Sequence, residues 1–283
     1  MDAKRRSYFN QFHSFQFNRE RYFAPKLYKA LKLQYQQFLT AYTSGKSVTD
    51  SLMSVSSAPI YNTLKPLYID AGVNYGSKIY ASLPKAPKKT KRRGMIGFDK
   101  QMIDLINAYF DEPILNTSEG ITTTTRELIQ VVMQIANEEG RGTDWIVEQL
   151  TIESDQLNNN RARLVARTET VTATNQAAWF AAAKTGLKMN KEWLSTQDNR
   201  TRTTPPSPFD HLSMNGFVTG FSGYFDVSDE WMLVPGAKVQ ENGLPTSAGN
   251  VCNCRCTCLY VPVKINGKYV EIDYGVWPVL EAA

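Results

Sequence analysis

The sequence contains very little histidine and cysteine. His13 and His211 are the only histidines, and the only four cysteines lie together at Cys252, Cys254, Cys256 and Cys258. Long apolar runs are also missing, because no stretch approaches the roughly 20 residues that a membrane helix needs. The basic N-terminus lacks the apolar core of a secretory signal. We therefore expect no membrane insertion, no export by the secretory route, and synthesis in a reducing cytoplasm, where structural disulfides are disfavoured.

Common enzyme motifs are absent as well. The chain has no G-x-S-x-G, no H-E-x-x-H, no phosphate-binding P-loop and no glycine fingerprint for dinucleotides. These absences argue against the hydrolases, zinc proteases and nucleotide-binding enzymes that depend on those motifs. We therefore expect a protein that is not an enzyme, and the sequence assigns no catalytic residue.

Charge is distributed unevenly along the chain. The 283 residues carry a formal net charge of +5. Residues 1–100 hold 18 Lys or Arg against 5 Asp or Glu, a balance of +13, whereas residues 101–283 hold 14 against 22, a balance of −8. We interpret this as a basic arm on a mildly acidic body. The arm either exposes a charged helical face to solvent or contacts something acidic, such as nucleic acid or a partner surface.

Helical periodicity dominates the aromatic-rich beginning of the chain. Apolar residues recur at helical intervals after Pro25, which suits a first helical turn, and this predicts a helix over 24–43. A second helix is predicted over 47–80, broken or kinked near Pro59 and Pro66.

The helical pattern continues to Gly186. In TTTTRELIQVVMQIANEEG, the predicted apolar stripe consists of Leu128, Val131, Val132 and Ile135. The stretch NNRARLVARTETVTATNQAAWFAAAKTG is predicted to be one longer helix that ends at Gly186. Its centre, TETVTATN, also fits a strand by alternation, but the length and the Ala-rich second half favour a helix.

A basic, proline-containing segment, LPKAPKKTKRRG, covers residues 83–94 and reads as an exposed linker. It is also a candidate contact with nucleic acid or a partner, through six basic residues: Lys85, Lys88, Lys89, Lys91, Arg92 and Arg93. We place the basic arm at 1–94 and a second domain at 95–283.

The character of the chain changes after Gly186. Short β-prone stretches such as KMNKEWLST and KYVEIDYGV are separated by Gly, Pro, Asn and Asp. The predicted fold class is α+β, with a helical N-terminal half followed by a mixed α/β domain that contains a small sheet.

The cysteine run NVCNCRCTCLY has two interpretations that the sequence leaves open. The four cysteines alternate with polar residues, which favours a strand that anchors the core with its cysteines buried and no cofactor. The alternative is a zinc site that combines Cys254, Cys256 and His211. On a regular strand, residues i and i+2 lie about 6.6–7 Å apart, so the chain must bend for both sulfurs to reach one ion. A disulfide within the run and a nucleophilic cysteine are both disfavoured.

Another polar cluster follows Trp193 in EWLSTQDNRTR. Asp198, Arg202 and His211 could form a set of acid and base groups, but an Asp–Arg pair near a turn more often fixes a loop. We therefore expect an Asp198–Arg202 ion pair that acts as a structural clamp.

The order of these motifs resembles a known family. RARLVARTET, KEWLSTQDNRTR, HLSMNG, VPGA and VCNCRC follow one another over about residues 120–260 as in the phage head morphogenesis domain of the Mu protein F-like family. The corresponding positions are Ala166, Arg167, Thr168, Glu169, Trp193, Asp198, Arg200, Thr201, Arg202, His211, Gly216, Asn253, Cys254, Arg255 and Cys256. One departure is TTPPSPFD, which intervenes before His211 and must loop out if the histidine is to meet the cysteines.

The resemblance implies a minor head protein of a tailed phage. Such a virion protein would be joined to the portal or the inner capsid and act in head assembly, DNA packaging or ejection. The implied partner is the portal protein, with the major capsid or scaffold protein and packaged DNA as further candidates. Two alternatives remain: an effector enzyme resembling ADP-ribosyltransferases, suggested by the Arg and Thr-Glu residues, and a free nucleic-acid-binding protein.

Overall fold

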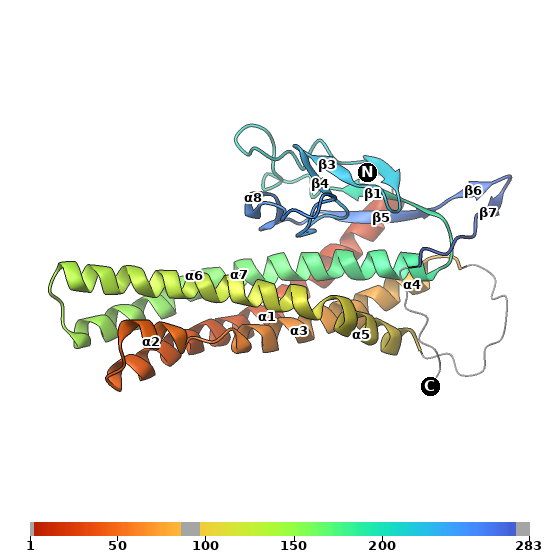
Figure 1. Cartoon of the computed structure of the whole chain (residues 1–283). Coiled ribbons are helices and arrows are strands. Elements are labelled where there is room, and N and C mark those ends of the chain that lie inside the picture. The colour runs from red at the N-terminus through yellow and green to blue at the C-terminus, as the bar shows by residue number, and fades with distance from the viewer. Residues whose placement is uncertain (1–2, 86–96, 276–283) are drawn as a thin grey trace. The chain divides into compact units, whose positions relative to one another are not determined.

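The computed structural model describes residues 3–85 and 97–275 (Figure 1). The helices are α1 (Ala3–Thr43), α2 (Val48–Met53), α3 (Ala58–Asp70), the π-helix η1 (Ala71–Gly76), α4 (Ser77–Ser82), α5 (Phe98–Tyr109), α6 (Asp111–Glu138), α7 (Thr143–Lys184) and α8 (Ala248–Val251). The strands are β1 (Met189–Leu194), β2 (Val218–Gly220), β3 (Phe225–Val227), β4 (Glu230–Met232), β5 (Thr257–Pro262), β6 (Lys264–Ile265) and β7 (Lys268–Tyr269). Long helices thus precede a small sheet region, and the predicted α+β class is confirmed.

The helices of the described ranges include no candidate for a membrane span. None of them is both long enough and apolar enough to cross a bilayer.

Helix α1 begins far earlier than the predicted start near residue 24, and Pro25 lies inside the helix rather than in its first turn. A proline in a helix interior removes one backbone hydrogen bond. Burial offsets that cost, because Phe12, Phe15 and Phe23 are all at most 7% exposed. The aromatic residues before Pro25 therefore extend the helix toward the N-terminus, where local propensity predicted a boundary.

The segment predicted as one kinked helix over 47–80 consists of four shorter elements. The chain leaves helical geometry between α2 and α3, and Pro59 occupies the second position of α3. Pro66 lies within α3 and does not end it. The backbone hydrogen bonds change from α-helical to π-helical spacing only after Asp70, where η1 begins. The predicted break near Pro59 is therefore confirmed, whereas at Pro66 the helix is not broken.

The chain forms two compact units, each assembled from separated segments. Unit 1 takes its described residues from Met1–Asn18, Tyr68–Ala108 and Arg167–Ala283, and unit 2 from Arg19–Leu67 and Tyr109–Ala166. Both units therefore combine segments from before and after residue 94. The predicted boundary at 94, and residues 86–94 of the predicted linker, lie outside the described residues.

Unit 2 contains a hydrophobic core and a polar layer formed by Gln34, Thr122 and Thr125. The core consists of Tyr35, Phe38, Leu52, Val55, Ile129, Val132, Ala136, Ile146 and Leu150. In the polar layer, Gln34 donates to Thr122 Oγ1 (2.7 Å) and accepts from Thr125 Oγ1 (2.9 Å). Such buried polar groups are tolerated because each has a hydrogen-bond partner.

The predicted apolar stripe of α6 is wrong in part. Val132 is buried, but Val131 and Ile135 are 54% and 38% exposed. The buried residues of α6 are Ile114, Ser118, Thr122, Thr125, Ile129, Val132 and Ala136. Polar threonines thus share the buried face with aliphatic residues, so hydrophobicity alone misplaces it by about one residue.

Unit 1 contains a three-stranded antiparallel sheet with the strand order β2-β1-β5. Trp193 of β1 pairs in register with Cys258 of β5. The sheet region lies along the C-terminal half of α7 (Figure 1), where the Trp179 ring stacks on Phe221 at 4.9 Å. Asn175 of α7 donates to the carbonyl of Cys256 at 3.0 Å. The second half of α7 therefore supports the segment that carries the cysteines.

The predicted cysteine strand is much shorter than the cysteine run. Strand β5 begins only at Thr257, so Cys258 alone lies on a strand. Cys252 is part of the turn after α8, and Cys254 and Cys256 lie in an irregular segment between α8 and β5. The four cysteines therefore do not share one strand face.

Candidate metal centre

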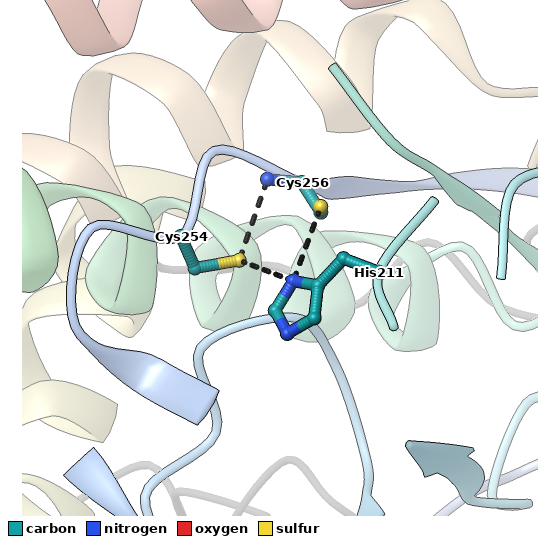
Figure 2. A group of neighbouring side chains, drawn as sticks. All are labelled: His211, Cys254 and Cys256. Carbon is teal, nitrogen blue, oxygen red and sulfur yellow. Dashed lines mark hydrogen bonds between the residues drawn. The ribbon is translucent and has the colours of Figure 1, made fainter. Parts of the chain in front are cut away.

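His211, Cys254 and Cys256 converge inside unit 1 (Figure 2). The Sγ atoms of both cysteines lie 3.6 Å from Nδ1 of His211. The three possible ligand atoms all lie within 4.8 Å of one another. Each residue is at most 2% exposed. The structure thus brings together the three residues of the sequence-based zinc alternative.

A left-handed residue bends the chain so that both sulfurs reach the histidine. Asn253 has φ of +60°, a region that asparagine tolerates better than most residues. Its backbone N–H donates to Thr168 Oγ1 (3.2 Å), and its Oδ1 accepts from Arg167 Nη1 (2.8 Å). Past the bend, the backbone N–H of Cys256 donates to the sulfur of Cys254 at 3.4 Å. Two family-motif residues of α7 therefore hold the cysteine loop in shape.

Arg202 ties the histidine segment to the cysteine loop. Its guanidinium donates to the carbonyl oxygens of Asn250 and Cys252. Its own carbonyl accepts the backbone N–H of His211 at 3.1 Å. Arg202 thus contacts both chain segments that meet at the cluster.

The expected Asp198–Arg202 clamp is wrong. Asp198 instead pairs with Arg200, whose Nη2 and Nε lie 2.6 and 2.9 Å from Asp198 Oδ2. This neighbouring pair lowers the pKa of Asp198 against the opposing effect of partial burial. Both Arg200 and Arg202 follow Asp198 closely in the sequence, and only the folded backbone decides which of them pairs with the Asp198 carboxylate.

Hydrogen bonds fix the protonation pattern of the His211 ring. Asn250 Nδ2 donates to Glu230 Oε2 at 2.8 Å, so the amide must present its oxygen on the other side. That oxygen lies 2.6 Å from Nε2 of His211. Because an amide oxygen can only accept, Nε2 carries the hydrogen. In the neutral ring, Nδ1 therefore presents its lone pair to the two sulfurs.

Trp193 and Gly216 complete the surroundings of His211. The Trp193 ring is fully buried and meets the His211 ring edge-on, with centroids 5.6 Å apart and an interplanar angle of 90°. Gly216 has φ of +87° and donates its N–H to the Trp193 carbonyl at 2.8 Å. The glycine thereby returns the loop after His211 to the sheet, which explains a motif residue that carries no side chain.

The two thiols differ in their acidity. The pKa of Cys254 lies below that of an ordinary thiol, because Cys256 can donate its S–H and His211 adds a further favourable interaction. Burial raises the pKa of Cys256, and the neighbouring Cys254 adds to this effect. Cys254 is therefore the thiol that loses its proton first.

A small pocket opens beside the cluster. Its lining includes Arg200, Arg202 and Arg255 together with Thr196, Thr201 and Asn253. His211, Cys254 and Cys256 also line the pocket, so it reaches the cluster itself. Its guanidinium groups, one of which is paired with Asp198, favour water or a small anion there. The family-motif residue Arg255 thus lies at the edge of the pocket.

A second polar cluster surrounds Glu169 of α7. The carboxylate accepts from Lys238 Nζ (2.7 and 2.6 Å) and from the Tyr68 hydroxyl (3.0 Å). Glu169 is only 3% exposed. A carboxylate held in this way joins α7 to other segments of unit 1, which favours a structural role over the catalytic one considered for an ADP-ribosyltransferase.

Sequence reasoning missed several residues that organise these clusters, namely Tyr68, Asn175, Glu230, Lys238 and Asn250. One signal was available in TETVTATN, an unusually polar stretch inside a long helix. Every residue from Thr168 to Asn175 is at most 7% exposed. Buried polar groups need hydrogen-bond partners, so such a stretch indicates polar contacts with other segments.

The residues predicted to contact nucleic acid or a partner do not belong to the clusters around His211 and Glu169. Lys85 is described, and its Nζ lies 4.6 Å from the centroid of the Tyr80 ring. Lys88, Lys89, Lys91, Arg92 and Arg93 lie outside the described residues.

Comparison with known proteins identifies one family. Residues 127–259 match the family model of the phage Mu protein F like protein. This range contains every family-motif position named above and agrees with the resemblance expected over about 120–260. No curated protein and no solved structure matches the chain significantly.

Proposed function

Because residues 127–259 match the family model of the phage Mu protein F like protein, we propose that this chain is a minor head protein of a tailed phage. A family of phage head morphogenesis proteins implies a location in the virion. The proposed partner is the portal protein or the inner capsid surface, and the proposed activity is in head assembly, DNA packaging or ejection. The family match is the observation that carries this proposal.

The internal contacts of the domain support a structural role. Arg167 and Thr168 hold Asn253, Glu169 is bound by Lys238, and Arg202 binds the loop that carries the cysteines. The family-motif side chains are thus used to join segments of unit 1. The family is structural rather than typically enzymatic. The role that we infer is therefore a stable scaffold for contacts with other virion proteins.

The basic N-terminal part supports a contact with an acidic partner. The balance of +13 over residues 1–100 contrasts with −8 over the rest of the chain. Packaged DNA is one source of matching negative charge, and contacts with phosphates weaken steeply as salt rises. We propose that Lys85 and the basic residues at 88–93 make this contact.

Cross-linking mass spectrometry on intact particles tests the proposal. The particles come from the phage or prophage that encodes this chain. We expect the protein in purified heads, with cross-links from Lys85, Lys88 and Lys89 to the portal protein. Absence from purified heads, or cross-links only to proteins outside the head, would refute the proposed role.

A matched pair of variants separates the basic segment from general charge. Lys88 and Lys89 are replaced by Gln in one variant. In the control, the exposed Lys264 and Lys268 of the β6–β7 hairpin are replaced by Gln. Only the first variant is expected to lose the contact with DNA or portal. Equal loss in both would exclude a specific role for the basic segment.

A further inference from the structure

We propose that His211, Cys254 and Cys256 bind one Zn²⁺ ion through Nδ1 and two thiolate sulfurs. The inference concerns unit 1 alone and does not depend on the role in a phage head. A site of this composition uses the nitrogen and sulfur ligands that zinc prefers. Binding converts both thiols to thiolates, so two protons pass to solvent for each ion bound.

The spacing of the ligand atoms fits a tetrahedral zinc centre. With Zn–S of about 2.3 Å and Zn–N of about 2.0–2.1 Å, a tetrahedron separates sulfur from nitrogen by about 3.5–3.6 Å. Both sulfur-to-Nδ1 distances in the structure are 3.6 Å. Both sulfurs therefore already lie at the distance from Nδ1 that one shared ion requires, and all three ligand atoms lie within 4.8 Å of one another.

Asn250 and Glu230, which do not themselves face the proposed ion, orient the His211 ring in the way that histidines are oriented in known metal sites. Histidines that bind zinc usually donate their other N–H to an oxygen acceptor, which fixes the ring and its tautomer. Here Nε2–H of His211 points to Asn250 Oδ1 at 2.6 Å, and Glu230 fixes the Asn250 amide. Nδ1 consequently presents its lone pair toward Cys254 and Cys256, as a ligand nitrogen must (Figure 2).

The fourth position falls to a ligand from the pocket. Within the described part of the chain, the cluster contains three His, Cys, Asp or Glu residues and no fourth. Cys252 and Cys258 do not belong to this group, and Cys258 lies on β5 opposite Trp193. The arginine-lined pocket beside the sulfurs supplies space for a water molecule or a small anion. Zinc with two thiolates and a neutral histidine carries no net charge, so the arginines do not oppose binding.

Metal analysis of the untagged full-length protein tests the assignment. The protein is purified with a phosphine reductant and without chelator, and zinc is measured by mass spectrometry. We expect about one equivalent of zinc in the wild type and in the control Cys252→Ser, but below about 0.1 equivalent in the double variant Cys254→Ser/Cys256→Ser. Zinc retained by the double variant would overturn the assignment.

Two measurements on the wild type remain decisive if the double variant does not fold. Co²⁺ added to zinc-depleted protein is expected to produce sulfur-to-cobalt charge-transfer absorption and the visible bands of a tetrahedral ion. Removal of zinc by a chelator is expected to raise alkylation of Cys254 and Cys256 while that of Cys252 stays unchanged. Wild-type protein without zinc and without cobalt bands would disprove the site.

An Asn250 variant distinguishes coordination from mere packing. Asn250→Ala removes the acceptor for Nε2–H, and we expect zinc affinity to fall by about 10–100-fold. Affinity is measured by competition with a chromophoric chelator, with Cys252→Ser as the unaffected control. Unchanged affinity in Asn250→Ala would contradict coordination by His211 in this orientation.

Discussion

Lys238 Nζ lies 2.7 and 2.6 Å from the two carboxylate oxygens of Glu169, and this ion pair connects the loop after VPGA to the middle of α7. The Glu169 side chain is 5% exposed and that of Lys238 is 29% exposed. A buried ion pair contributes little net stability compared with a well-packed apolar pair. Loss of one partner is far more harmful, because the other charge is then left buried without compensation.

Replacement of Lys238 therefore has a large expected effect. In Lys238→Met, the free energy of unfolding is expected to fall by about 2–3 kcal/mol, since the Glu169 carboxylate keeps only the Tyr68 hydroxyl. The double variant Glu169→Gln/Lys238→Met is expected to recover part of this loss. Chemical denaturation of the three proteins measures both effects. Additive losses in the double variant would show that the two side chains are not coupled.

Arg202 and Arg200 form a matched pair that tests which arginine supports the cysteine loop. Arg202→Ala removes charged donors from two backbone carbonyls, and we expect a loss of about 2 kcal/mol. Arg200→Ala removes a largely exposed pair with Asp198 and is expected to cost about 0.5 kcal/mol. Thermal unfolding under reducing conditions compares them. A larger loss in Arg200→Ala than in Arg202→Ala would show that Arg202 is not the main support of the cysteine loop.

Gly236 and Gly267 test close packing against α7. Both have positive φ, +79° and +76°, so alanine introduces backbone strain of about 1 kcal/mol at either position. At Gly236 an added Cβ would also lie 3.3 Å from Thr172 Oγ1, whereas at Gly267 it meets nothing within 4 Å. We expect Gly236→Ala to lose about 2–3 kcal/mol and Gly267→Ala about 1 kcal/mol. Equal losses in denaturation experiments would mean that the loop at Gly236 can move away from α7 freely.

The lowered pKa of the buried Lys191 side chain makes stability depend on pH. Burial lowers the pKa of this side chain from 10.5 to about 8, while Nζ donates to the Leu233 carbonyl at 2.6 Å. Between pH 8 and 10.5 the unfolded chain binds more protons at this site than the folded protein, so stability rises with pH in this window. Below pH 8 both states carry the charge, and the full cost of burying it is present.

The comparison with Lys191→Met isolates this contribution. From pH 7.5 to 9, the wild type is expected to gain about 1 kcal/mol in unfolding free energy relative to the variant. The tyrosines and Cys258 titrate in both proteins, and their effects largely cancel in the difference. Denaturant unfolding at the two pH values, with reductant present, gives the measurement. A difference that stays constant with pH would show that Lys191 titrates normally.

Local patterns predicted much of the helical architecture but misplaced boundaries. The helix through TETVTATN was predicted from its length and Ala-rich end, and α7 confirms it. The start of α1 was missed because Pro25 suited a first turn, whereas burial of the preceding aromatic residues extends the helix beyond it. On α6, threonines with hydrogen-bond partners occupy the buried face, and a count of apolar residues cannot recognise them.

At the candidate site, too, the sequence predicted some features correctly and others not. Residue type made the four cysteines and His211 candidates for zinc, and the family resemblance pointed to the inner pair, Cys254 and Cys256. Alternation also favoured a strand for the whole cysteine run, and this was wrong because Asn253 bends the chain in the left-handed region. The partners that set the geometry, such as Asn250 and Glu230, have no distinctive spacing, so no pattern in the sequence indicated them.

By itself the sequence determined the fold class, the resemblance to a family and the types of residue available for a site. These follow from local properties: hydrophobic period, turn residues and the order of motifs along the chain. Only the tertiary structure decided which arginine binds Asp198, which cysteines meet His211 and which atom of its ring faces them. Those outcomes depend on contacts between segments distant in the chain, where hydrogen-bond geometry and burial select one partner among several of the same chemistry.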